Sequence, residues 1–288
     1  MQIFKFTFAK KTNKMKTINC RGKLINFDIP KIMAIVNLTP DSFYADSRCE
    51  NVEIAVNHID KALQNGADMI DLGACSSRPG ADEIGVDEEW QRLEPVLAEA
   101  RRQFPEVIIS IDTYRSKIAE MAVAAGADII NDISCGYDAQ MFSTIARLQV
   151  PYVLTHMRGT PATMQQFVDY KNVTSEVMTE LSQKLRQITN LGVHDVIIDP
   201  GFGFSKTLEQ NYELFAHLSE FKIFDKPMLV GISRKSMIYK LLDITPDKAL
   251  NGTTVLNTLA LQAGAAILRV HDVAEAVEVR KIWGKIGE

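Results

Sequence analysis

The sequence predicts a (β/α)8 barrel that starts at Lys31, and three observations support this prediction. Eight short runs rich in β-branched residues alternate with longer amphipathic segments, as in a parallel sheet that helices cover. The spacing of the runs leaves room for a strand and a crossover helix in each unit, which together need about 30 residues. Three similar stretches, which begin at Asn65, Ala125 and Ala263, place a glycine between a helix and the next strand, where a left-handed residue ends a helix.

The predicted elements follow one another in order along the chain. The strands are residues 32–36, 69–72, 107–111, 129–133, 152–154, 196–198, 228–232 and 267–270. The fourth and seventh helices are less distinct, and the clearer amphipathic segments are residues 52–65, 87–102, 116–125, 173–191, 208–218, 253–264 and 272–285. An open doubly wound sheet is the alternative architecture, but no Gly-x-Gly-x-x-Gly follows a strand, which argues against its dinucleotide-binding form.

The N-terminal part precedes the predicted barrel units. Residues 17–28, with a turn at Arg21-Gly22-Lys23, are predicted to form a hairpin that closes the bottom of the barrel. Residues 1–16 form an extension, which lacks the long apolar core of a secretory signal. Residues 17–288 are therefore expected to form a single domain.

The composition indicates a folded protein and excludes several function classes. The chain has 288 residues, of which 46% are hydrophobic, which is too apolar for disorder. With 32 basic against 36 acidic residues and no block of like charges, a broad nucleic-acid surface is not expected. No stretch reaches the roughly 18 apolar residues that a membrane span requires. The spacing of the cysteines fits neither a zinc site nor a disulfide framework, so we expect reduced thiols in a cytoplasmic protein: Cys20, Cys49, Cys75 and Cys135.

Polar residues stand at or just after the ends of the predicted strands, where the active site of a barrel lies. In chain order they are Asn37, Asp71 with Gly73, Asp112, Asn131, His156, Asp199, Lys235, and Arg269 with His271. Structural alternatives exist, because Asp112 and Asp272 could cap the helices that follow them and Asn131-Asp132 could form an ordinary turn. The convergence of so many polar groups on one face favours a binding site.

These groups predict a ligand with two chemically different parts. The acceptors suit a flat heterocycle with adjacent N–H donors, such as a pterin or a purine, and are Asp112, Asn131 and Asp199. A positive set suits a phosphate or a carboxylate and comprises Arg78, Lys235, Arg269 and His271. Residues 230–236 lead from the seventh strand into a helix, whose N-terminus favours an anion. The alternative for this segment is a capping serine with an exposed arginine and lysine.

Several segments resemble the dihydropteroate synthase family, the sulfonamide-inhibited enzymes of folate biosynthesis, and the resemblance spans roughly residues 17–288. In the order of the family they are Ile35-Val-Asn-Leu-Thr-Pro-Asp-Ser-Phe43, Asp71-Leu-Gly-Ala-Cys-Ser-Ser-Arg-Pro-Gly80, Ile111-Asp-Thr, Asn131-Asp-Ile, Asp199-Pro-Gly-Phe-Gly-Phe204, Gly231-Ile-Ser-Arg-Lys-Ser236 and Arg269-Val-His-Asp272. Two departures are small: Ala34 stands where a glycine is common, and Ser77 keeps the hydroxyl of the usual threonine.

The resemblance implies an enzyme, a transferase with two small-molecule substrates. In that reaction p-aminobenzoate displaces pyrophosphate from 6-hydroxymethyl-7,8-dihydropterin diphosphate, with Mg2+ as cofactor, and gives 7,8-dihydropteroate. The resemblance also implies a homodimer formed through outer helices.

The resemblance further implies a role for individual residues. The pterin would bind to Asp112, Asn131, Asp199, Lys235 and Arg269, with Arg269 stacked over its ring. The diphosphate would contact Asn37, Arg78, Arg269 and His271. Asn37 would also be the metal ligand, because Mg2+ accepts a neutral oxygen when phosphates supply the rest. The p-aminobenzoate would be framed by Phe43, Ser77, Pro79, Lys235 and Ser236.

The catalytic set implied by the resemblance is Asp112, Lys235, Asn37 and Arg269. Within this set, Asp112 would stabilise the cation left on the pterin methylene as pyrophosphate departs. Two other functions stay open at this point. One is a pterin-binding barrel that moves a methyl group to a corrinoid protein, which should lack the loop 37–43 and the stretch 76–79 present here. The other is a non-catalytic pterin-binding module.

Overall fold

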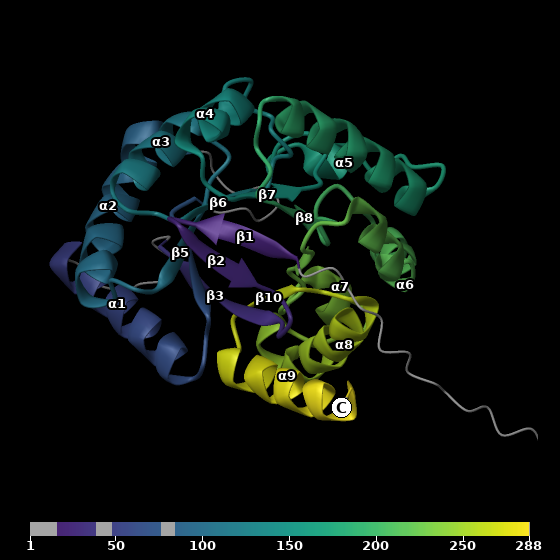
Figure 1. Cartoon of the computed structure of the whole chain (residues 1–288). Helices are drawn as coiled ribbons and strands as arrows, with labels where there is room; N and C mark the ends of the chain where they lie inside the picture. The colour runs from purple at the N-terminus through teal and green to yellow at the C-terminus, as the bar shows by residue number, and fades with distance from the viewer. Residues whose placement is uncertain (1–15, 39–47, 76–83, 288) are drawn as a thin grey trace, which may run out of the picture.

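The computed structural model describes residues 16–38, 48–75 and 84–287, which form a ring of parallel strands surrounded by helices (Figure 1). The hydrogen-bonded order of the strands is β8-β7-β6-β5-β4-β3-β10-β9. A parallel bridge between Ile198 and Met228 completes the ring, and the Ile198 N–H donates to the Pro227 carbonyl at 2.9 Å. The predicted (β/α)8 barrel is confirmed, and the open doubly wound sheet is wrong.

The barrel strands are β3 (Lys31–Asn37), β4 (Met69–Gly73), β5 (Ile108–Asp112), β6 (Ile129–Asp132), β7 (Tyr152–Thr155), β8 (Val196–Asp199), β9 (Leu229–Val230) and β10 (Ile267–Val270). Seven of them agree with the predicted ranges to within one residue at each end. The seventh was predicted over 228–232 but has only two residues, because the chain leaves the sheet there and turns toward the next helix.

The helices of the described residues are α1 (Arg48–Gln64), α2 (Val86–Gln103), α3 (Ser116–Ala124), α4 (Met141–Leu148), α5 (Val173–Asn190), α6 (Leu208–Ala216), α7 (Ser236–Tyr239), α8 (Leu250–Ala263) and α9 (Val273–Gly287), with 3-10 turns at η2 (Met164–Gln166), η3 (Leu218–Phe224) and η4 (Pro246–Lys248). The two less distinct helices are the short α4 and α7. The repeated glycines that were predicted to end helices, Gly66, Gly126 and Gly264, all have φ near +100°, at +96°, +105° and +105°. No helix in these residues is long and apolar enough to cross a membrane.

The predicted N-terminal hairpin is present and lies across one end of the ring (Figure 1). Strand β1 (Thr17–Cys20) pairs antiparallel with β2 (Lys23–Asn26). Arg21 and Gly22 both have positive φ, which is the requirement of a tight type I′ turn. Ile18 and Cys20 pack against the first inward residues of the strands, so the hairpin closes the amino-terminal end of the barrel as predicted. Apart from Lys16, the predicted extension 1–16 lies outside the described residues.

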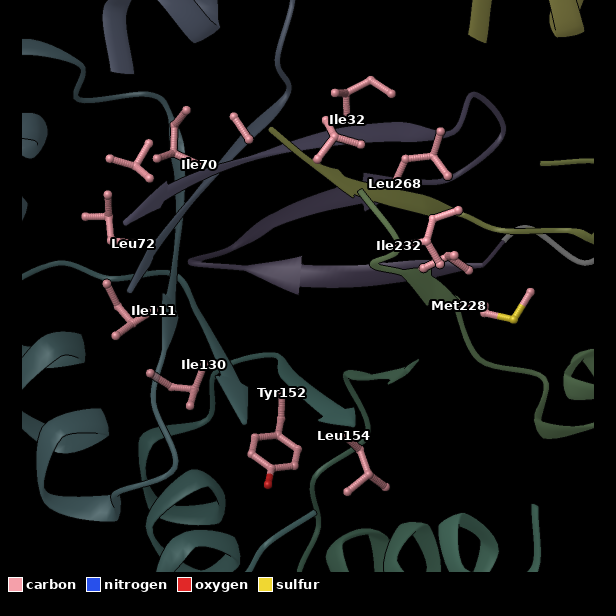
Figure 2. Packing of buried hydrophobic residues seen from close by; sticks show 14 of the residues in the cluster. Ile32, Ile70, Leu72, Ile111, Ile130, Tyr152, Leu154, Met228, Ile232 and Leu268 are labelled. Carbon is pink, nitrogen blue, oxygen red and sulfur yellow. The ribbon is translucent and has the colours of Figure 1, made fainter. Parts of the chain in front are cut away.

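The strands are apolar on both faces because each face packs against a different layer. Outward side chains meet the helices, and Figure 2 shows ten of them around the ring: Ile32, Ile70, Leu72, Ile111, Ile130, Tyr152, Leu154, Met228, Ile232 and Leu268. Inward side chains near the hairpin form a second cluster that includes Met33, Met69, Ile129, Ile197 and Ile267. Since side chains alternate along a strand, the inward positions continue two residues at a time to the polar groups at the carboxyl ends.

Candidate active site

The inward positions at the carboxyl ends of the strands carry a buried polar cluster. Counting in twos from the inward hydrophobic residues leads to Asn37 on β3, Asp71 on β4, Asp112 on β5, Asn131 on β6, Asp199 on β8 and Arg269 on β10. Asp112 and Asn131 are direct partners in the β5–β6 register. The four residues among these that are most deeply buried are Asp71, Asp112, Asn131 and Asp199. The structure thus brings the predicted pterin-binding residues to one end of the barrel.

Arg269 is the centre of an ion-pair network that spans three strands. Its Nε donates to Asp71 Oδ2 at 2.6 Å, and its Nη2 donates to Asp112 Oδ2 at 2.5 Å. Asn131 Nδ2 donates to the same Asp71 oxygen at 3.0 Å. Although burial disfavours its charge, the two carboxylates raise the pKa of Arg269. One cation is therefore shared between two carboxylates.

Asp112 is the carboxylate of this network that has a raised pKa. Burial raises the pKa of Asp112 to about 7, although the Arg269 guanidinium opposes the rise. The alternative that Asp112 caps the next helix is wrong, because the first N–H of α3, on Ser116, is bonded by Asp138 at 2.8 Å. Asp112 is therefore free of a capping role and points into the barrel at the carboxyl end of β5.

Lys235 lies between β9 and α7, against the β8–α6 loop (residues 200–207). Its Nζ donates to the Phe202 carbonyl at 2.5 Å and stands 4.4 Å from the centre of the Phe204 ring. A Cβ on Gly203 would lie 3.2 Å from Lys235 Cδ, so the lysine stem runs directly over this glycine. Burial lowers the pKa of Lys235 to about 8, against the attraction of Asp199. Burial also raises the pKa of Asp199, and Lys235 opposes that shift.

The segment around Lys235 is not the exposed cap that was the alternative. Arg234 donates to both carboxylate oxygens of Asp272 at 2.8 Å, which ties the loop after β9 to the loop after β10. Asp272 is thus engaged by Arg234, and Ser236 is the first residue of α7 as predicted. His271 is exposed, and Ser233 Oγ lies 3.3 Å from its Nδ1.

Residues 33–271 match the family described as pterin binding enzymes. The dihydropteroate synthase of Escherichia coli (strain K12) is 39% identical over 264 residues, which are 91% of this chain and 93% of that protein. The chain belongs to the dihydropteroate synthase family. It is accordingly a folate-pathway transferase, and the corrinoid-linked and non-catalytic alternatives are wrong.

Solved structures of dihydropteroate synthases have the same fold. The Yersinia pestis enzyme in complex with a sulfonamide drug matches with a TM-score of 0.88 and 36% identity, over 94% of this chain and 98% of that one. The Xanthomonas albilineans enzyme in complex with 7,8-dihydropteroate matches with a TM-score of 0.84 and 34% identity, over the same shares of the two chains.

Not every predicted residue of the dihydropteroate synthase site can be placed. Phe43, Ser77, Arg78 and Pro79 lie outside the described residues. Among the described residues no group of three or more His, Cys, Asp or Glu side chains could hold a metal ion. Asn37, at the inward end of β3, offers one neutral amide oxygen.

His156 was expected to be one of the polar groups at the strand ends, but it does not face the pocket. It follows the inward Thr155, so its ring points outward, where it is completely buried. Its Nε2 lies 3.0 Å from Glu180 on α5, and its Nδ1 lies 3.0 Å from Lys206 Nζ. Burial lowers the pKa of His156 to about 4 and that of Lys206 to about 7.

Sequence reasoning missed two residues of the site region. Asp71 was noted at a strand end but was given no role, although its spacing of two from the inward Met69 indicates that it faces the pocket. Lys206 was not predicted to be a site residue, because a lysine after an apolar loop is expected to be exposed to solvent. No local pattern in the sequence shows that its acceptors lie in the same loop and on His156, just after β7.

Proposed function

We propose that this pocket binds 6-hydroxymethyl-7,8-dihydropterin diphosphate and that p-aminobenzoate displaces its pyrophosphate to give 7,8-dihydropteroate. The observation that carries the proposal is the joint placement of three acidic groups, one amide and two cations at the inward ends of six barrel segments: Asp71, Asp112, Asn131, Asp199, Lys235 and Arg269. Membership of the dihydropteroate synthase family supports this substrate pair.

The ring of the pterin is assigned to the buried acceptors. The Asp199 carboxylate accepts hydrogen bonds from the N–H donors on the polar edge of the ring, and the Asn131 amide can both donate and accept there. Lys235 donates to a ring acceptor beside Asp199. Arg269 is held on one edge by Asp71 and Asp112, so its planar face is available for stacking on a flat heterocycle. Because the pocket is largely apolar beneath these groups, each hydrogen bond discriminates strongly between ligands.

Asp112 is the residue assigned to the chemical step. As the carbon–oxygen bond to pyrophosphate breaks, positive charge develops on the pterin methylene, and a preorganised carboxylate stabilises it by roughly 3 to 4 kcal/mol. The amino group of p-aminobenzoate is unprotonated at neutral pH, so no strong base is required. The remaining residues orient the two substrates and keep water from capturing the cation.

The leaving group is assigned to the cationic side of the pocket. His271 and Arg269 face the diphosphate, and Asn37 supplies a neutral oxygen to Mg2+. The donor set fits such an ion, because a single amide oxygen leaves the remaining positions to phosphate oxygens and water. When bound, Mg2+ neutralises the charge of the departing pyrophosphate. Ser236, at the start of α7, receives the carboxylate of p-aminobenzoate, which Lys235, Phe43, Ser77 and Pro79 frame. Arg78 is assigned to the diphosphate.

A homodimer is supported by large apolar side chains that are exposed on neighbouring outer elements. Val255 and Leu259 lie one turn apart on α8 and are each 50% exposed, and Leu241 and Leu242, just after α7, are 55% and 50% exposed. A patch of this kind marks an association surface. A cytoplasmic location is supported by the free thiols of Cys20, Cys75 and Cys135.

The direct test is turnover of 6-hydroxymethyl-7,8-dihydropterin diphosphate with p-aminobenzoate, followed by pyrophosphate release. Pyrophosphate and 7,8-dihydropteroate should appear in equal amounts and only when both substrates and Mg2+ are present. Removal of Mg2+ with a chelator should stop the release. Pyrophosphate release that does not depend on p-aminobenzoate would contradict the proposal.

A further inference from the structure

Behind the proposed pterin pocket lies a buried cluster that the proposed reaction does not use. It consists of Lys206 in the β8–α6 loop, His156 at the end of β7, and Glu180 and Arg158, which are bonded to each other. Lys206 and His156 are both buried, and they bond to each other and to Glu180 on the outward side of β7, away from the inward groups assigned to the pterin. Figure 1 shows that α5, which carries Glu180, covers the side of the barrel formed by β7 and β8.

The ammonium of Lys206 has three acceptors at hydrogen-bond distance. They are the Gly201 carbonyl at 2.9 Å, the Phe204 carbonyl at 3.0 Å and His156 Nδ1 at 3.0 Å. His156 can accept because its Nε2 faces the Glu180 carboxylate, which selects the tautomer with the proton on Nε2. Three donors therefore meet three acceptors, two of them in the loop and one on His156, just after β7.

The loop that Lys206 holds contains two glycines in left-handed conformations and one non-glycine residue in an unfavourable one. Gly201 and Gly203 have φ of +72° and +82°, and Ser205, which is not a glycine, has φ of +44°. A Cβ on Gly201 would lie 1.9 Å from the His156 carbonyl, so the loop touches the end of β7. Such a conformation persists only where surrounding contacts impose it. Lys206 holds the loop through the Gly201 and Phe204 carbonyls. Asn211 on α6 holds it as well, because its side-chain oxygen accepts from the Gly203 N–H at 2.7 Å.

The same loop shapes the pterin-facing groups. The Gly201 N–H donates to Asp199 Oδ1 at 2.8 Å, which orients that carboxylate. The Phe202 carbonyl accepts from Lys235, whose stem crosses Gly203 and whose ammonium lies over the Phe204 ring. Lys206 bonds the two carbonyls on either side of these contacts, those of Gly201 and Phe204.

We propose that Lys206 is a positioning residue: with His156 as its third acceptor, it clamps the β8–α6 loop in the conformation that orients Asp199 and Lys235 toward the pterin. The proposal rests on the proposed function, because it requires that Lys235 contacts the pterin. It predicts that removal of the buried ammonium weakens pterin binding although Lys206 touches no ligand.

The test compares Lys206→Met with Lys235→Met and Lys16→Met. Lys16 is a matched control, since its half-buried Nζ donates to the Lys226 carbonyl at 2.9 Å, outside the pterin pocket. We expect Lys206→Met to weaken the binding of 6-hydroxymethylpterin at least tenfold in calorimetry, and Lys16→Met to leave it unchanged. If Lys235→Met leaves the affinity unchanged, the proposed function fails. If Lys235→Met weakens it but Lys206→Met does not, the clamp is overturned and the proposed function stands.

A second readout separates positioning from general loss of structure. In protein labelled with 15N at lysine side chains and studied at pH 6, the hydrogen-bonded Lys235 ammonium should give a protected signal. We expect Lys206→Met to shift or remove this signal, whereas Lys16→Met should not. An unchanged Lys235 signal in Lys206→Met would contradict the clamp even where its melting temperature has fallen.

Two His156 variants keep the proposal testable if Lys206→Met does not fold. Asparagine places an amide oxygen near the position of Nδ1 and preserves the third acceptor, whereas leucine removes it. We expect the pterin affinity of His156→Asn to stay within about threefold of the wild type and that of His156→Leu to fall at least tenfold. Equal affinities in the two variants would overturn the clamp.

Discussion

The two ends of the barrel both contain buried carboxylates paired with arginine, but only one end satisfies them fully. At the amino-terminal end, Asp128 accepts from Arg101 at 2.6 Å and from the Ile109 N–H at 2.8 Å. Arg101 also donates to the carbonyls of Pro105, Val107 and Gly126. At the carboxyl end, Arg269 serves two carboxylates at once, and among the described residues Asp71 Oδ1 is buried without a hydrogen-bond partner.

This difference separates an ion pair that stabilises the fold from one that is arranged for a ligand. A completed pair adds specificity to the folded state, and breaking it leaves a buried charge. An incomplete cluster keeps a carboxylate poorly solvated, which raises the pKa of Asp112 to about 7 by burial. Strongly perturbed groups in a pocket are typical of functional sites. Substitutions at the two ends should therefore affect different properties.

The largest effect is expected on stability at the amino-terminal end. Arg101→Met should lower the free energy of unfolding by about 3 to 5 kcal/mol, because it removes the buried ion-pair partner of Asp128 and leaves it only the Ile109 N–H and the exposed Arg21, 3.6 Å away. The activity of the folded fraction should not change. Urea unfolding and steady-state kinetics measure the two properties. Arg102→Met, which breaks only an exposed pair with Glu99, is the matched control and should alter neither property measurably.

Asp112→Asn should have the opposite signature at the carboxyl end. The substitution keeps the shape but removes the charge that we assign to the developing cation, so we expect kcat to fall by about 100-fold to 1,000-fold, which corresponds to roughly 3 to 4 kcal/mol. Asp68→Asn, at the Arg280 pair of the other end, should reduce stability and leave kcat unchanged. A loss confined to KM in Asp112→Asn would assign that residue to ground-state binding instead.

Asp199→Ala should weaken the pterin more than p-aminobenzoate. The carboxylate accepts charge-assisted hydrogen bonds in a desolvated site, and their loss should reduce pterin affinity by about 2 to 3 kcal/mol. Calorimetry with 6-hydroxymethylpterin measures this loss directly. Unchanged affinity would remove Asp199 from the pterin site and would weaken the contrast between the two ends.

Most of the fold could be predicted from the sequence because the relevant signals are local. Strand runs and helix-ending glycines depend on neighbouring residues, and the alternation along each strand already directs Asp71 and Asp112 inward. The seventh strand was predicted too long because the apolar run continues to Ile232 after the chain has left the sheet.

The choice of partners could not be predicted in the same way. Arg269 bonds residues that lie 198 and 157 positions away, so the charge balance of the pocket depends on barrel closure rather than on any motif. The acceptors of Lys206 include His156, 50 positions away. The role of such a charged residue therefore cannot be predicted until the fold defines its neighbours. The same limit explains why the residue pattern alone placed Lys235 only in a positive set, and why its individual role came from the family resemblance.

The smallest effect should appear in the pH dependence of catalysis. With a pKa of about 7 in the free enzyme, Asp112 is protonated at lower pH, so kcat/KM should fall about tenfold per pH unit on the acid side. Lys235, with a pKa of about 8, loses its charge at higher pH, so a second fall should follow on the alkaline side. Asp112→Asn should abolish the acid limb and keep the alkaline one. Ionisation of the substrates is common to both enzymes and cancels in the ratio of their rates. An acid limb of equal size in Asp112→Asn would show that another group carries the titration. The raised pKa of Asp112 would then reflect its burial alone and would have no catalytic role.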